Sequence, residues 1–319
     1  MALGEIVVCS GGLLVAQRGA QFSAEGPALH VGDVRPVSTP ASRPAEARRS
    51  DNMVWRRHWL EDARLVIQFV DLATVEVDNA TGTVVFDRFL PSEMEEHLLF
   101  DHVLPLALAR DGALVLHAGL ISSDRDGVVL VGASGAGKST LTAFAWQKGW
   151  TVGGDDGVVL FATTPPTVEP TYSTVRLTPQ SADLLGFAAE GTSSVVGKMR
   201  LAANGTRAFS QDPVRLSLIG IIEPAPAGDA ARFERLAPID AHAQLFGSTF
   251  HADFSWGRLL PGVVDRLASI VETTTVGNLS VPRGLDGLVA AERLLRTVLE
   301  NECDCGGVGA AETAGPGQH

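Results

Sequence analysis

The middle of this chain carries the run Gly132-Ala133-Ser134-Gly135-Ala136-Gly137-Lys138-Ser139-Thr140. It matches the pattern G-x-x-x-x-G-K-[ST], in which glycines let successive backbone N–H groups surround phosphate oxygens. The apolar, β-branched residues 127–131 come before it and predict a buried strand, and residues 141–146 continue past it with helical composition. Strand, glycine loop and helix therefore follow one another in the order that a phosphate-binding loop requires.

The pattern also predicts the role of each part of the loop. Backbone N–H groups of residues 132–140 would contact nucleotide phosphates, aided by the partial positive charge at the helix N-terminus. Lys138 would reach the β- and γ-phosphates, and the Ser139 hydroxyl would hold Mg²⁺. Lys138 is one of only three lysines in the chain, and a compact ammonium fits a crowded phosphate site better than a guanidinium. We therefore expect ATP and Mg²⁺ as ligands.

Composition narrows the class of protein. The chain has 319 residues, of which 45% are hydrophobic, so a substantial core is available. A net charge of −12 argues against nucleic acid as a partner, and no apolar run approaches the ~20 residues that cross a bilayer. Three cysteines (Cys9, Cys303 and Cys305) do not make a disulfide framework, and no basic signal segment is evident, so the cytoplasm is the expected location. A homo-oligomer stays open.

The first part of the chain, residues 1–95, has the alternation and turns of a small β-rich domain. Strands are expected within residues 5–32 and over 64–70, 73–78 and 84–86, and the Pro- and Arg-rich residues 33–53 read as a loop. A helix should begin with Ser92 as its N-cap and end near Leu104, because Pro105 lacks an N–H group. This part is a candidate for substrate recognition.

Residues 96–300 read as an α/β catalytic domain. Beyond the loop helix, the pattern predicts a strand at residues 150–152, which leads into Gly153-Gly154 and the carboxylate pair, and another at 158–161. Later elements are predicted as a strand at residues 216–223 and as helices at residues 179–187, 239–250, 262–273 and 285–299. The low-complexity residues 301–319 should form a disordered tail, in which Cys303 and Cys305 lack the further ligands that a metal site needs.

The chemistry beyond the loop points to Asp155 and Asp156. Adjacent carboxylates at the end of a strand point in different directions, so one can face a metal while the other faces an incoming hydroxyl. His117 ends the strand that precedes the loop strand, so its imidazole would lie near the γ-phosphate or the carboxylates if those two strands are neighbours. A surface acidic turn and a buried core histidine are the alternative interpretations.

The segments Leu116–Gly119, Gly132–Ser139 and Gly154–Asp156, in this order and spacing, resemble the catalytic core of the HPr kinase/phosphorylase family. The resemblance implies an α/β P-loop kinase core of the HPr kinase/PEP carboxykinase type beside the β-rich part. It further implies that His117 lies close to the transferred phosphate, that Asp155 acts as general base toward a serine hydroxyl, and that Asp156 assists the metal.

The segments Tyr172–Leu177 and Gly197–Arg200 resemble those of HPr kinase-related proteins from bacterial peptide-modification clusters, some of which phosphorylate a serine at the C-terminus of a lasso-peptide precursor. Arg176, Lys198 and Arg200 would then contact phosphate or a peptide carboxylate. Residues 1–95 do not match the family's regulatory domain, and Glu169 is the nearest acidic residue to the family's second signature. HPr itself is therefore not the expected substrate.

Together these features predict an ATP- and Mg²⁺-dependent serine kinase acting on a peptide or protein. A small-metabolite kinase needs the same base and metal and remains an alternative, as does a non-catalytic nucleotide-binding regulator. A motor-type ATPase is disfavoured, because the chain has no Leu-Ser-Gly-Gly-Gln-like segment and no long apolar strand ending in Asp-Glu far downstream.

Overall fold

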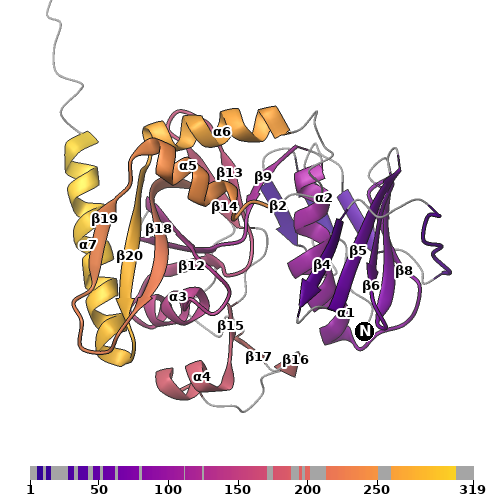
Figure 1. Cartoon of the computed structure of the whole chain (residues 1–319), viewed down its shortest axis with the longest axis horizontal. Coiled ribbons are helices and arrows are strands. Elements are labelled where there is room, and N and C mark those ends of the chain that lie inside the picture. The colour runs from indigo at the N-terminus through magenta and orange to yellow at the C-terminus, as the bar shows by residue number, and fades with distance from the viewer. Residues whose placement is uncertain are drawn as a thin grey trace, which may run out of the picture.

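The computed structural model shows a mixed α/β protein, in which the described residues form three sheets (Figure 1). This confirms the predicted α/β class. The structure describes residues 6–9, 12–15, 28–31, 35–41, 46–50, 53–61, 64–78, 81–110, 112–123, 126–170, 175–187, 194–195, 198–201, 213–250 and 260–306. Most of the predicted tail, residues 307–319, lies outside these ranges.

The first sheet contains eight strands in the order β2-β1-β3-β8-β7-β6-β5-β4. Its strands are β1 (Ile6–Cys9), β2 (Gly12–Val15), β3 (Ala28–Val31), β4 (Glu46–Ser50), β5 (Met53–Glu61), β6 (Arg64–Phe69), β7 (Ala73–Asp78) and β8 (Thr83–Phe86). The predicted loop over residues 33–53 is wrong in its second half, where β4 pairs with β5. Arginines in β4 obscured the strand in the sequence, and charged side chains are common on edge strands such as this one.

A helical stretch over residues 92–110 packs against this sheet and lies between it and the rest of the molecule (Figure 1). It consists of α1 (Ser92–Leu98), the π-helical turn η1 (Leu99–Val103) and α2 (Leu104–Arg110). Pro91, not Ser92, takes the N-cap position, and no side chain caps the helix. The stretch also continues through Pro105, because the wider π turn brings the N–H of Leu104 to the carbonyl of Leu99 just before the proline.

We expect His102, in the π turn, to make the stability of the fold depend on pH. Its ring lies 5.1 Å from the Trp55 ring and 5.7 Å from the Phe69 ring. Burial lowers the pKa of His102 to about 3; the nearby charge of Asp101 opposes this shift, and those of Arg56, His97 and Arg176 add to it. The unfolded chain therefore binds more protons than the folded one between pH 6.5 and pH 3.

Lowering the pH through this window should cost about 1 kcal/mol of unfolding free energy per pH unit at His102. The variant His102→Phe keeps a ring between Trp55 and Phe69 but removes the titrating group. We expect the pH dependence of its unfolding free energy, measured by urea titration from pH 7.5 to pH 4.5, to be shallower by about that amount. Equal slopes in the two proteins would contradict the assignment.

The second sheet contains nine strands and carries the glycine loop. Seven of its strands follow the order β12-β10-β11-β18-β14-β13-β9. The other two extend it as a branch, in which β20 pairs with β18 and β19 pairs with β20. The strands are β9 (Leu114–Leu116), β10 (Gly119–Ser123), β11 (Asp126–Val131), β12 (Thr151–Gly154), β13 (Val158–Phe161), β14 (Thr167–Pro170), β18 (Val214–Ala225), β19 (Arg232–Arg235) and β20 (Thr275–Pro282). β19 and β20 were not predicted; in β20 the polar residues Asn278 and Ser280 interrupt the apolar pattern.

Helices cover both faces of this sheet (Figure 1). They are α3 (Lys138–Gln147) and α7 (Leu285–Gly306) on one face and α5 (Pro238–Phe246) and α6 (Leu260–Thr273) on the other. Alternate residues of β11 serve the two cores: Val128 and Leu130 pack with α3 and α7, whereas Val129 and Val131 pack with α5 and α6. This explains why the loop strand is a continuous apolar run. Helix α7 also extends past its predicted end at Leu299.

A third, small sheet has the order β15-β17-β16, from β15 (Val175–Leu177), β17 (Lys198–Leu201) and β16 (Ser194–Val195). It contacts helix α3 through its strand β15 and helix α1 through its strand β16. Helix α4 (Pro179–Leu185) follows β15, with Thr178 as its N-cap, and matches the predicted helix at 179–187 to within its last turn. No helix among the described residues is long and apolar enough to cross a membrane.

Candidate active site

The glycine loop connects the end of β11 to the start of α3, as the sequence predicts. Gly132, Gly135 and Gly137 have φ angles of 153°, 80° and 104°, a region in which side chains other than glycine are strained. Gly137 is also the N-cap of α3, with no side chain capping the helix. Residues 133–135 are exposed. The loop therefore presents backbone at an open helix N-terminus, which favours an anion.

Lys138 extends from the first turn of α3 across the loop. Its ammonium donates hydrogen bonds to the carbonyl oxygens of Gly132 (2.7 Å) and Ala133 (3.2 Å), and the side chain is buried. Burial lowers the pKa of Lys138, while the charges of Asp155 and Asp156 oppose that shift. The lysine is thus already held at the loop, beside the carboxylate pair, where its charge is little solvated.

Asp155 and Asp156 follow the end of β12, and both are buried. The Asp155 carboxylate accepts a hydrogen bond from the backbone N–H of Arg176 (3.2 Å), and the nearby Ser139 side chain favours its ionised form. Burial, together with the charge of Asp156, nevertheless raises the pKa of Asp155 to about 7. Asp155 is therefore poised to exchange a proton near neutral pH.

Asp156 has the opposite ionisation. Nε and Nη2 of Arg176 donate to its Oδ2 at 3.2 Å and 2.5 Å. Burial alone would raise the pKa of Asp156, but the charge and hydrogen bonds of Arg176 outweigh it and lower the pKa. One carboxylate of the pair thus stays ionised while its neighbour can take up a proton.

His117 reaches the carboxylates by a route that the sequence argument did not foresee. The strand before it, β9, is not a neighbour of β11, because β10 pairs with β11 and β9 pairs with β13. The ring still lies at the site, with Nδ1 2.9 Å from the backbone oxygen of Asp156. Burial, then the charge of Lys138, lowers the pKa of His117. A neutral imidazole that donates from Nδ1 fits this contact.

The three cations predicted to contact anions differ in their surroundings. Arg176 is buried and faces carboxylates of the protein itself, which is not the position expected of a residue that meets a ligand. Lys198 lies near the site, because its charge affects the pKa values of Lys138, Asp155 and Asp156. Burial is the largest cause for all three groups, and the charge of Lys198 is a smaller one. Arg200 pairs with Arg176 across β15 and β17, and its side chain lies outside the described ones.

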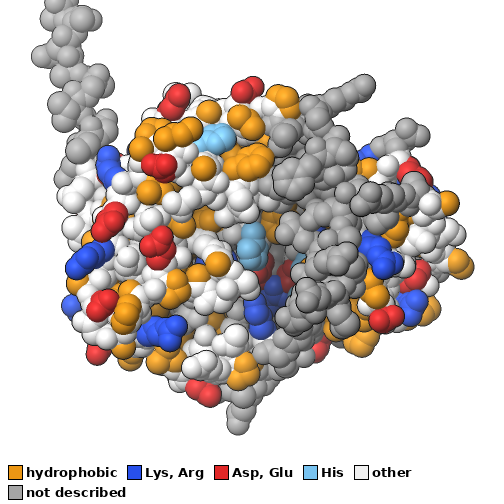
Figure 2. Space-filling model, in the orientation of Figure 1, with side chains coloured by type: hydrophobic (Ala, Val, Ile, Leu, Met, Phe, Trp, Pro, Cys, Tyr) orange, Lys and Arg blue, Asp and Glu red, His pale blue; other side chains and the backbone are white. Residues whose placement is uncertain are grey.

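Figure 2 shows histidine, acidic and basic side chains close together near the middle of the visible face, next to residues that are not described. Ser139, Asp155 and Asp156 contribute a hydroxyl and two carboxylates to the glycine-loop site. The oxygen atoms available there suit Mg²⁺, which prefers hard oxygen ligands. Oδ1 of Asp155 is buried, and no hydrogen bond from a described residue reaches it. Ser139 and Asp156 therefore offer oxygen ligands that fit a magnesium ion, with Oδ1 of Asp155 unengaged beside them.

A second group of possible metal ligands is less suitable. His97, Asp101 and His102 have ligand atoms within 4.8 Å of one another. The Arg176 guanidinium, however, contacts two of these three residues, Asp101 and His97. At the glycine loop it contacts one carboxylate, that of Asp156, whereas Asp155 accepts from the backbone N–H of Arg176. The group of three belongs to an ion-pair cluster around Arg176 rather than to a metal site.

Sequence reasoning missed Gly119, which the structure places under the carboxylates. A Cβ atom there would lie 2.7 Å from Oγ1 of Thr142 in α3 and 3.8 Å from Oδ1 of Asp155. The resembling segment ended at this glycine, but nothing in the sequence indicated the contact. The missing side chain lets β10 approach the loop helix.

The variant Gly119→Ala should therefore be destabilised by about 1–3 kcal/mol, because Thr142 is buried and has to move. Gly220→Ala is the matched control: it lies inside β18, where the nearest atoms to an added Cβ are 3.6 Å away. Alanine is tolerated at such a spacing and restricts the unfolded chain. Urea unfolding of both variants measures the difference, and equal stability of the two would contradict this role of Gly119.

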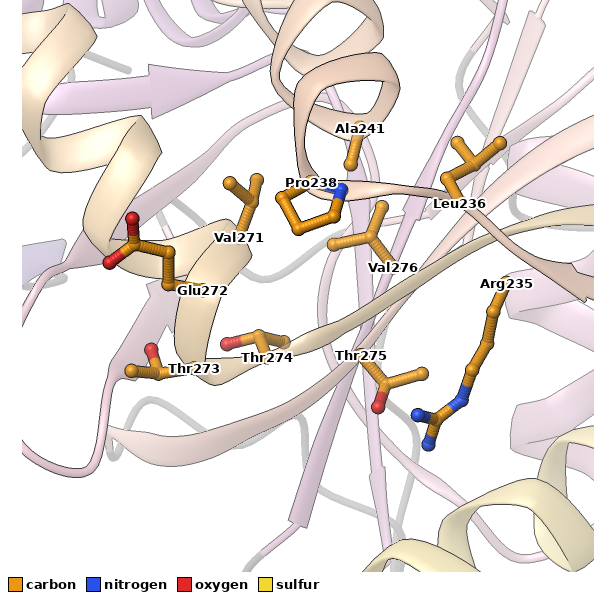
Figure 3. Close-up of a pocket in the computed structure, with 10 residues that line it drawn as sticks. All are labelled: Arg235, Leu236, Pro238, Ala241, Val271, Glu272, Thr273, Thr274, Thr275 and Val276. Atoms are coloured by element: carbon orange, nitrogen blue, oxygen red, sulfur yellow. The ribbon is translucent and has the colours of Figure 1, made fainter.

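A cavity of about 310 Å³ lies elsewhere, between the start of α5, the end of α6 and the β19–β20 pair (Figure 3). Arg235, Glu272 and Thr274 are among its lining residues. It shares no residue with the glycine loop or the carboxylate pair. We therefore place the chemistry at the loop and not in this cavity.

Comparisons with known proteins add little to this geometry. No family model matches the chain, and no curated protein matches it. Among solved structures, the chain is similar to the HPr(Ser) kinase/phosphatase from Coxiella burnetii, with 14% sequence identity over 60% of this chain and 94% of that chain and a TM-score of 0.33. At that TM-score, the functional conclusion has to rest on the site itself.

Proposed function

We propose that this chain is a phosphotransferase that uses ATP and Mg²⁺ to phosphorylate a hydroxyl group. One observation carries the proposal: the lysine and serine that begin α3 lie against two buried carboxylates whose pKa values are shifted in opposite directions. Pairs of titratable groups with diverging pKa values are typical of sites that divide acid–base work. Nucleotide binding alone would not need such a pair.

Phosphate binding would occur at the glycine loop. The backbone of residues 132–137 and the N-terminus of α3 would surround the β- and γ-phosphates. Lys138 would exchange its contacts with the loop carbonyls for phosphate oxygens, which are stronger partners because they are charged. The neutral His117 would lie beside the transferred group without adding repulsion toward Lys138.

The transfer would use Asp155 as general base. The acceptor oxygen forms a bond to the γ-phosphorus as the bond from phosphorus to the β,γ-bridging oxygen breaks, and ADP leaves with that electron pair. The hydroxyl proton passes to the Asp155 carboxylate, whose raised pKa makes it a competent acceptor near neutral pH. Ionised Asp156 would keep its charge throughout.

Ser139 and Asp156 would hold Mg²⁺, which when bound would neutralise charge that develops on the phosphates. The Ser139 hydroxyl would then face the cation rather than Asp155. Oδ1 of Asp155, which no hydrogen bond from a described residue reaches, would be left for the acceptor hydroxyl.

We propose a serine hydroxyl of a peptide or protein as the acceptor, and a lasso-peptide precursor ending in serine as the first substrate to test. The support is positional: the small sheet that carries Lys198 and Arg200 lies beside the site, and its strand β16 contacts α1 of the helical stretch. An extended peptide that reaches the carboxylates would pass Lys198 and the helical stretch.

The test incubates the protein with ATP, Mg²⁺ and each member of an acceptor panel and detects products by mass spectrometry. The panel contains a precursor peptide ending in serine, the same peptide ending in alanine, and small hydroxyl metabolites. Phosphoserine on the first peptide alone supports the proposal. Phosphate on a small metabolite alone would show that the acceptor is a metabolite and not a peptide. No transfer to any member of the panel in the presence of Mg²⁺ would count against a phosphotransferase.

A further inference from the structure

We infer that Asp101, assisted by His97, is a positioning residue of the transfer site, which it reaches from the helical stretch by way of Arg176. The inference rests on the proposed function and adds to it: the helical stretch of residues 92–110 becomes part of the site. The structure shows a chain of contacts that runs from Asp101 to Arg176 and from Arg176 to Asp156.

The contacts meet at one guanidinium. Nη2 of Arg176 contacts Oδ2 of both Asp101 and Asp156, and Nη1 lies 2.6 Å from Nδ1 of His97. Arg176, Asp101 and Asp156 are each at most 8% exposed. A planar, permanently charged fork suits a position between two carboxylates, and a lysine would not reproduce it.

Asp101 comes to this position because of the π turn. It lies in η1 and is buried, and His97 lies one turn earlier in α1, with its Nδ1 2.5 Å from Oδ2 of Asp101. The two side chains therefore face the same way, toward β15 and Arg176. Single-turn π bulges occur frequently at functional sites, and this one aims a carboxylate out of the helical stretch.

The charge count explains what Asp101 does. A single Arg176 cation is shared between two buried carboxylates, so it cannot neutralise both, and its attraction is divided between Asp101 and Asp156. If Asp101 lost its charge, the whole attraction of Arg176 would fall on Asp156 and would compete with a cation for that carboxylate. Asp101 therefore weakens the electrostatic attraction between Arg176 and Asp156.

Stability alone does not explain the cluster. Burying charges is costly, and apolar residues of similar volume often stabilise a fold as well or better. Replacing residues that orient a ligand of a metal commonly costs ten- to a hundredfold in activity or metal affinity. The cluster of Asp101, Arg176 and Asp156 includes a proposed metal ligand, Asp156, so a role in orienting that ligand fits it better than a role in stability.

The first part of the test needs no nucleotide. Thermal unfolding midpoints are measured for the wild type, Asp101→Asn, Arg176→Lys and the double variant. Because the two residues touch, the shift in the double variant should be smaller than the sum of the two single shifts. Glu93→Gln removes an equal charge from an exposed position on α1 and should be additive with Arg176→Lys. Additive shifts for Asp101 and Arg176 would overturn the inference.

The second part measures steady-state kinetics with ATP, Mg²⁺ and the serine peptide. Asp101→Asn should lower kcat about tenfold, leave the KM for ATP within about twofold, and raise the Mg²⁺ concentration at half-maximal rate. In the Arg176→Lys background the same substitution should change kcat little, which a merely structural role would not produce. An unchanged kcat in Asp101→Asn overturns the inference. Coupled unfolding shifts in a protein whose wild type transfers no phosphate would instead sink the proposed function.

Discussion

Asp155→Asn is expected to abolish phosphate transfer while ATP binding is retained. Removing a general base typically lowers kcat about 10²–10⁴-fold, or about 3–5 kcal/mol of activation free energy. An asparagine oxygen can still accept the hydrogen bond that the Arg176 N–H donates to Asp155. The geometry of the loop should therefore survive the substitution. Mass spectrometry of the serine peptide and calorimetry with an ATP analogue separate the two effects.

The stability of Asp155→Asn provides the control for misfolding. Asp155 is buried beside a second carboxylate, and like charges in such a position are mutually unfavourable. Its unfolding midpoint should therefore be no lower than that of the wild type. Asp183→Asn, at an exposed position on α4, is the matched substitution and should keep full activity. Undiminished transfer by Asp155→Asn would show that the base lies elsewhere.

Lys138→Met should weaken ATP binding about 100-fold. Truncating one partner of a buried, hydrogen-bonded charge pair costs about 2–5 kcal/mol of binding free energy, and Lys138 is the cation that spans the loop. Lys138→Arg should bind poorly as well, because a planar fork does not fit where the ammonium lies against two carbonyl oxygens. Isothermal calorimetry with a non-hydrolysable ATP analogue measures the dissociation constants.

The matched control for Lys138 is Lys148, which follows the last residue of the same helix. It is exposed, and its ammonium lies 5.1 Å from the centre of the Phe144 ring. Lys148→Met removes an equal charge and should leave ATP affinity within about twofold, because an exposed charge at the far end of α3 is well screened. Equal affinities for wild type and Lys138→Met would mean that phosphate does not bind at this loop.

Local pattern was enough to place the strand, the glycine loop and the helix. The run 127–131 is apolar because both faces of β11 are covered, and the loop glycines have left-handed φ angles that other residues avoid. The Asp155-Asp156 pair also ends its strand as expected. Each of these features depends on residues close together in the chain, so the sequence displays them directly.

Features that depend on distant residues were predicted poorly. The assumed neighbour of β11 was wrong, yet His117 reaches Asp156 because β9 pairs with β13, whose chain follows directly from the carboxylates. Strand β20 was missed, since its support comes from β18 and β19 on either side rather than from its own composition. The partners of Arg176 were missed for the same reason.

The sequence alone determined that a phosphate-binding type of loop stands on a buried strand, with two carboxylates after the next strand. Periodicity and backbone preference are properties of neighbouring residues, so they can be read without a fold. The tertiary structure decided the ionisation of those carboxylates, because burial and Arg176 shift their pKa values in opposite directions. The tertiary structure also brings the Asp101 carboxylate into contact with the Arg176 guanidinium. Charges act through space, and only folding sets the distances between them.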